Sequence, residues 1–179
     1  MKGIIVGDWK WKIYEQALFE GFKKNGIKIL KFSTTPSINS YLQKKIRNGS
    51  QIILLNKKLL DFINKNNPNF IFFQRNYLIF PNTIKLIKNK YPKTILINYH
   101  NDNPFLHNFK WLRYRHFFNS IKYFNINYSY RPSNIKDFKK YGSKHTKLLL
   151  PYYIEGVHDQ DIKIEKKYEK LSKEISDPK

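Results

Sequence analysis

Polar side chains that can accept protons or bind anions follow several hydrophobic segments of this 179-residue chain. Asp8 comes directly after the first such segment, and His100 and Asp102 come after a later one. An imidazole titrates near neutral pH, and a carboxylate in a cationic setting stays ionised, so each can act as a general base. His100 and Asp102 are therefore the candidate catalytic residues.

Both candidate bases also have a structural interpretation, which stays open. A histidine at the end of a strand can form a hydrogen bond with the backbone instead of acting as a base, and this alternative applies to His100. Residues 101–104 read Asn-Asp-Asn-Pro, which is good turn chemistry because Asn and Asp side chains bond to their own backbone. Asp102 is thus either a turn residue or a functional one.

A further polar group follows the fifth expected strand. Arg131 precedes Pro132, and Ser133 is expected to cap a helix that Gly142 ends. A helix N-terminus beside a guanidinium favours an anion, although a simple N-cap explains Ser133 equally well. Together with the first loop, the candidate binding residues are Asp8, Trp9, Asn101, Asn103, Arg131, Ser133 and Asn134.

Short apolar segments alternate with segments of helical period, and this pattern predicts the architecture that positions these residues. Strands that alternate with helices are typical of a parallel sheet with right-handed crossovers. We expect a Rossmann-like α/β fold, an open parallel sheet of about six strands with helices on both faces. The expected strands are residues 3–6, 27–32, 69–73, 94–99, 124–130 and 148–152.

The loops after the first, fourth and fifth expected strands share the carboxyl edge of such a sheet. Ligands of open α/β sheets bind at this edge, so we expect the candidate residues to meet in one crevice.

The pattern of apolar and helical segments divides the chain into a Rossmann-like domain over residues 1–154 and a charged amphipathic helix or tail over residues 155–179. In that tail, Ile164, Tyr168, Leu171 and Ile175 recur at helical spacing.

The composition limits the classes of function. The net charge is +21, from 34 basic and 13 acidic residues, and only six acids precede residue 155. This excess favours an anionic partner, although a compositional bias toward Lys, Asn and Ile explains it as well. The chain has no cysteine, and its five histidines lack the spacing of a ligand set, so no metal site is expected.

The first loop excludes proteins that bind nucleotides through a glycine-rich motif. The lengths of the apolar runs exclude a signal peptide and a membrane span. Gly7 is the only glycine of the first loop, so neither a dinucleotide fingerprint nor a P-loop is present. The apolar run at the N-terminus is too short for a signal peptide, and no later run approaches the ~18 residues of a membrane span. We therefore expect a cytoplasmic protein.

The order of these motifs resembles the N-terminal lobe of GT-B-fold glycosyltransferases of the CgeB-like, family-1-like group. The likeness covers about residues 1–155 and rests on residues 4–9, 98–105, 130–135, 139–142 and 149–153. The resemblance implies an acceptor lobe, with Asp102 or His100 as the base of a metal-independent sugar transfer. A nucleotide-sugar would be the donor substrate, no cofactor is implied, and the donor lobe has no counterpart in this chain.

The resemblance and the positive charge together indicate the expected partners. These are a glycan or phosphorylated acceptor, a separate donor-lobe polypeptide, and peripheral contact with an anionic membrane. The alternative is a non-catalytic cationic binding module for an anionic glycan, phospholipid or nucleic acid. Nucleic acid ranks last because no recognised nucleic-acid-binding motif occurs.

Overall fold

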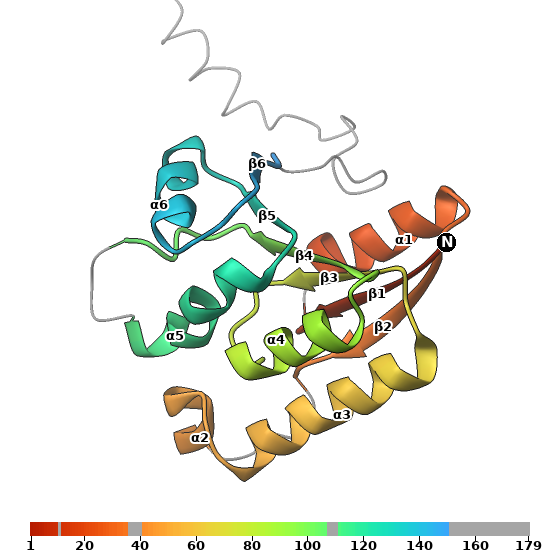
Figure 1. The fold of residues 1–179 in the computed structure, drawn as a ribbon, viewed down its shortest axis with the longest axis horizontal. Helices are drawn as coiled ribbons and strands as arrows, with labels where there is room; N and C mark the ends of the chain where they lie inside the picture. Colours follow the sequence, from red (N-terminus) through yellow and green to blue (C-terminus); the bar gives the residue numbers. More distant parts are fainter. Residues whose placement is uncertain (11, 36–40, 107–110, 151–179) are drawn as a thin grey trace, which may run out of the picture.

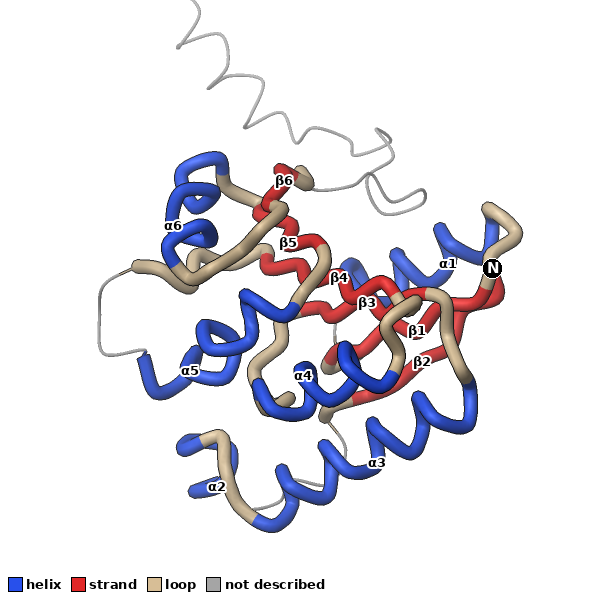
Figure 2. The backbone as a smooth tube through the Cα atoms, viewed as in Figure 1, coloured by secondary structure: helices blue, strands red, loops and turns tan. Residues whose placement is uncertain are grey.

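Residues 1–10, 12–35, 41–106 and 111–150 are described by the computed structural model, and six of their segments pair in one sheet. The strand order is β2-β1-β3-β4-β5-β6, and every neighbouring pair is parallel. The expected six-stranded parallel sheet is therefore confirmed (Figure 2). The strands are β1 (Lys2–Gly7), β2 (Lys28–Ser33), β3 (Phe70–Gln74), β4 (Ile95–His100), β5 (Ile126–Ser129) and β6 (Thr146–Leu148).

Helices connect successive strands, as the alternating pattern predicts. Those of the described ranges are η1 (Lys12–Gln16, a π-helical turn), α1 (Ala17–Lys24), α2 (Tyr41–Ile46), α3 (Ser50–Asn66), α4 (Pro81–Lys90), α5 (Trp111–Ser120), η2 (Ile121–Tyr123), η3 (Pro132–Asn134) and α6 (Ile135–Lys140). Pro81 occupies the first turn of α4, where its missing N–H costs least.

The helices divide unequally between the two faces of the sheet. The connection from β1 to β2 runs in one direction along the sheet, whereas every later connection runs in the other. Right-handed crossovers therefore place α1 on one face and the later helices on the opposite face. Figure 1 shows this division, with α1 on one side of the strands and α3 and α4 on the other.

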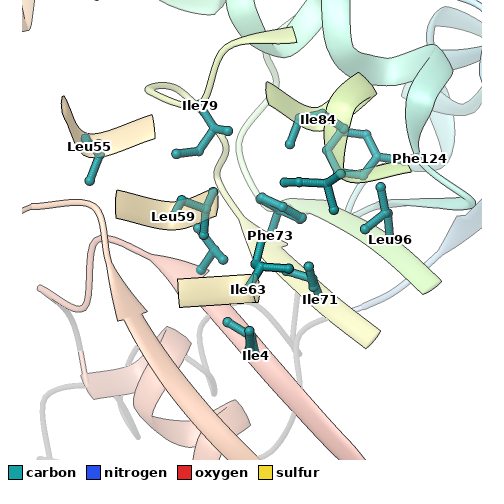
Figure 3. Packing of buried hydrophobic residues seen from close by; sticks show 12 residues of the cluster. Ile4, Leu55, Leu59, Ile63, Ile71, Phe73, Ile79, Ile84, Leu96 and Phe124 are labelled. Atoms are coloured by element: carbon teal, nitrogen blue, oxygen red, sulfur yellow. The ribbon is translucent and has the colours of Figure 1, made fainter. Parts of the chain in front are cut away.

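The core between the sheet and α3 is built from residues that recur along one side of that helix. Leu55, Leu59 and Ile63 are buried on α3 and belong to the same apolar cluster as Ile71 and Phe73 of β3. Figure 3 shows these side chains gathered between the helix and the strands. Each side chain of this size contributes about 1.5–3 kcal/mol when it is fully buried.

Two local predictions need correction. The sixth strand was expected at residues 148–152, but β6 ends at Leu148, because Asn127 to Ser129 of β5 pair with Thr146 to Leu148. Ser133 was expected to cap a helix, but it lies inside the 3-10 turn η3, and no side-chain hydrogen bond caps α6.

The expected helix or tail over residues 155–179 lies outside the described residues. None of the helices in the described ranges combines the length and the apolar character that a membrane crossing requires.

Candidate functional site

The carboxyl edge of the sheet has a switch point between β1 and β3. The connection that follows β1 and the connection that follows β3 lie on opposite faces, so their first loops separate at this point. A cavity of about 310 Å³ lies there, lined by the ends of β1 and β3 and by loops from elsewhere in the chain. Its charged lining residues are Asp8, Lys10, Arg47, Arg75, Asp102 and Arg113.

Arg75, which directly follows β3, joins two carboxylates that follow β1. Its Nη2 lies 2.9 Å from Asp8 Oδ1 and 3.5 Å from Glu15 Oε1. Its guanidinium also lies over the ring of Tyr14, 4.8 Å from the centroid. The backbone of Arg75 has a φ of +51°, and its N–H donates to the Tyr99 carbonyl over 3.0 Å. A non-glycine residue is uncommon in this region and must be held there by its surroundings.

Glu15 is fully buried beneath the first loop. The π-helical turn η1 carries it, and the backbone N–H of Asp8 donates to its Oε1 over 3.2 Å. A Cβ on Gly7 would lie 2.6 Å from that same oxygen, so only glycine leaves room for the carboxyl group. Burial raises the pKa of Glu15, the Asp8 charge raises it further, and Arg75 opposes both. Turns of this kind are frequent at functional sites.

Tyr77 forms a second part of the cavity wall. Its hydroxyl donates to Asp102 Oδ2 over 3.0 Å, which ties the loop after β3 to the loop after β4. Burial raises the pKa of Tyr77, with further increases from Tyr114 and Asp102. The guanidinium carbons of Arg47 and Arg113 lie 5.8 and 5.3 Å from the centroid of the Tyr77 ring.

The turn between α2 and α3 carries Arg47 and is held against α5. The carbonyl of Arg47 accepts a hydrogen bond from His116 Nε2 over 2.6 Å, and the carbonyl of Ile46 accepts one from Arg115 over 2.5 Å. Arg113 precedes these two residues on the same helix. Residues that are distant in the sequence are therefore fixed on one wall of the cavity.

His100 lies beside this wall but is enclosed by rings. It is 1 % exposed, and the rings of Tyr77, Tyr114 and Phe117 have centroids 5.3, 5.7 and 4.9 Å from its own. Burial lowers the pKa of His100 by more than the Asp102 carboxylate raises it, and the resulting pKa is about 4. Its Nδ1 donates to the Asp102 carbonyl over 3.3 Å, which matches the structural alternative for this residue. His100 is thus a neutral core side chain, and it does not line the cavity.

Of the nine candidate residues, the structure brings Asp8 and Asp102 to the same cavity. Trp9 instead packs toward β2, where its Nε1 donates to the Phe32 carbonyl over 3.0 Å. Asn103 is a turn residue whose Oδ1 accepts from the backbone N–H of Phe105 over 3.1 Å. Asn101 has a buried Oδ1 without a hydrogen-bond partner among the described residues.

The group after β5 does not share this cavity. Arg131 and Ser133 are exposed, and Asn134 is buried. The guanidinium of Arg131 lies over its neighbour Tyr130, 5.6 Å from the ring centroid. The expected single crevice of the first, fourth and fifth loops is therefore corrected: β3 lies between β1 and β4, so its loop occupies the centre of the site.

The residues of this site that were not found from the sequence include Lys10, Glu15, Arg47, Arg75, Tyr77 and Arg113. The sequence contained a signal for two of them. Glu15 is one of only six acidic residues before residue 155, and Arg75 stands at the end of the third expected strand. No three side chains of the kind that bind metals come together within the described part of the chain.

The sequence matches no family model and no curated protein. Among solved structures, the chain is similar to the isolated REC domain of RcsB from Salmonella enterica serovar Typhimurium, determined in the presence of phosphomimetic BeF3−. The two are 13 % identical with a TM-score of 0.44, over 82 % of this chain and 93 % of that one.

The glycosyltransferase resemblance is wrong by this comparison, because the solved structure is a REC domain and no family model supports a GT-B lobe. The acceptor-lobe function and the sugar-transfer roles of Asp102 and His100 are withdrawn with it. The motifs misled for a physical reason. Asn103 and Pro132 lie in tight turns after parallel strands, and such turns need the same residue types in any sheet of this kind.

Proposed function

We propose that this domain binds a small molecule in the cavity above β1 and β3. The observation that supports this is the convergence of six charged side chains, from separate segments, on one cavity at the switch point of the sheet. Its volume of about 310 Å³ suits a ligand of metabolite size. The Asp8–Arg75 pair would give such a ligand a fixed donor and a fixed acceptor on one side.

A bulky substitution tests this proposal. Thr34 lines the cavity and is partly exposed, so Thr34→Trp places an indole ring in the space that the ligand would occupy. We expect ligands found by screening phosphorylated, carboxylated and uncharged metabolites to shift the amide resonances of Thr34, Asn76 and Tyr77 in the full-length chain. The variant should lose this binding at least about tenfold.

Ser133→Trp is the matched control. Ser133 is exposed at the same edge of the sheet but outside the cavity, so the same ring there should leave binding unchanged. If every ligand found by the screen bound the Thr34→Trp variant as tightly as the natural chain, the cavity would not be the binding site. A screen without any binding at these amides would also contradict the proposal.

A further inference from the structure

Two positive charges on the cavity wall, those of Arg47 and Arg113, have no carboxylate partner among the described residues. In the described part of the chain, neither Arg47 nor Arg113 forms an ion pair. The two carboxylates that line the cavity have other partners: Asp8 is paired with Arg75, and Asp102 accepts the hydroxyl of Tyr77. The cavity therefore has an excess of positive charge at this wall.

Arg47 and Arg113 both lie over the ring of Tyr77, and their charges repel each other. Both guanidinium carbons lie within 6 Å of the centroid of the Tyr77 ring, at 5.8 and 5.3 Å. Burial lowers the pKa of Arg47, and the positive charge of Arg113 lowers it further. The Nε atom of Arg47 is also buried without a hydrogen-bond partner among the described residues. An anion between the two groups would remove their repulsion.

We propose that the ligand carries a phosphate monoester, whose dianionic group binds between Arg47 and Arg113 at the Tyr77 ring. This inference rests on the proposed function and names the chemical class of the ligand. Two guanidiniums match two negative charges, and their planar donors fit the oxygens of a phosphate. A carboxylate would neutralise only one of them.

The other two arginines at this edge are not suited to the same role. The charge of Arg75 is already opposed by Asp8 and Glu15, at 2.9 and 3.5 Å. Arg131 lies outside the cavity and contacts the ring of Tyr130. The ring of Tyr77, by contrast, is held by the bond of its hydroxyl to Asp102, so the surface that supports both guanidiniums is fixed.

Titration of the full-length chain with phenyl phosphate, benzoate and phenol tests the charge requirement, because the three probes share one ring. We expect phenyl phosphate to bind most tightly by calorimetry. Arg113→Ala should weaken it at least about tenfold, since a charge-assisted hydrogen bond is lost. The double variant Arg47→Ala, Arg113→Ala should abolish measurable binding, and Arg131→Ala, the matched control, should stay within about twofold.

The pH dependence supplies a second readout, which a change in folding would not mimic. The second proton of a phosphate monoester leaves near pH 6, so affinity for phenyl phosphate should rise several-fold from pH 5 to pH 7. Affinity for benzoate should not rise over that range. Circular dichroism and thermal unfolding of each variant show whether the fold is kept.

The outcomes separate this inference from the proposed function. If screened ligands bind the cavity but phenyl phosphate does not bind, or binds the Arg113→Ala variant equally well, the phosphate inference is overturned and the function stands. If no compound binds the cavity and Thr34→Trp changes nothing, both are overturned. Equal losses in the Arg131→Ala and Arg113→Ala variants would also overturn the inference.

Discussion

Replacing Arg75 with methionine is expected to lower the free energy of unfolding by about 3 kcal/mol at pH 7. Arg75 is 12 % exposed and is the cation that faces fully buried Glu15. Without it, Glu15 keeps an uncompensated charge beside Asp8, and removing one partner of a buried pair costs more than the pair itself contributes. Urea unfolding at fixed pH measures the loss.

The sign of the pH dependence follows from the raised pKa of Glu15. The folded state holds the Glu15 proton at pH values above the unfolded pKa of 4.5, so stability is lost as pH rises through the folded pKa. The Arg75→Met variant should therefore recover part of its deficit between pH 7 and pH 5. The double variant Arg75→Met, Glu15→Gln should recover this loss of stability at pH 7, because the buried carboxylate is then absent. A loss below about 0.5 kcal/mol, as at an ordinary surface position, would show that the pair is not needed.

Acidification from pH 7 to pH 5 should cost the folded state about 2 kcal/mol through His100 alone. Its pKa is about 4 in the folded chain and 6.5 when exposed, so the unfolded state binds the proton first. The surrounding rings of Tyr77, Tyr114 and Phe117 exclude water, and Arg75 and Arg113 further disfavour a charge there. The negative charge of Asp102 opposes these effects; its influence is weaker than that of burial but stronger than that of either arginine.

His100→Asn is the variant that isolates this contribution. Its amide nitrogen can still donate to the Asp102 carbonyl, as Nδ1 of His100 does, but it does not titrate. The variant should be less stable at pH 7 because it leaves space among the rings, yet should lose less stability on acidification. His145→Asn, at an exposed position, offers a comparison. Parallel pH profiles for His100→Asn and the natural chain would contradict the prediction.

The fold could be predicted because each of its elements is specified by a local pattern. The apolar run of residues 70–73 predicts a buried strand, and the spacing of Ile52, Leu55, Leu59 and Ile63 predicts the buried side of a helix. The sequence around the end of α1 carries the same kind of signal, because glycine readily takes the φ of +70° that Gly26 has just after the C-cap Asn25. These patterns do not depend on which strands become neighbours.

The site could be predicted only in part, because it depends on the order of the strands. Asp8 and Asp102 were found as polar residues after apolar runs, whereas Arg75 gains its importance from the position of β3 beside β1. Arg47 comes from a turn that is fixed by His116, a residue 69 positions away. No local pattern specifies a contact over that distance. The enclosure of His100 likewise depends on rings from a helix that follows it.

The position of β1 between β2 and β3 determines when the sheet can be completed. Lys2 and Asn69 form hydrogen bonds across the β1–β3 junction although they lie 67 residues apart. Closing so long a loop is slow compared with forming the β1–α1–β2 unit, which uses neighbouring residues. One edge of β1 is therefore expected to stay unpaired until β3 has formed and paired with it. We therefore expect the cavity, which needs both strands, to form later than the β1–α1–β2 unit.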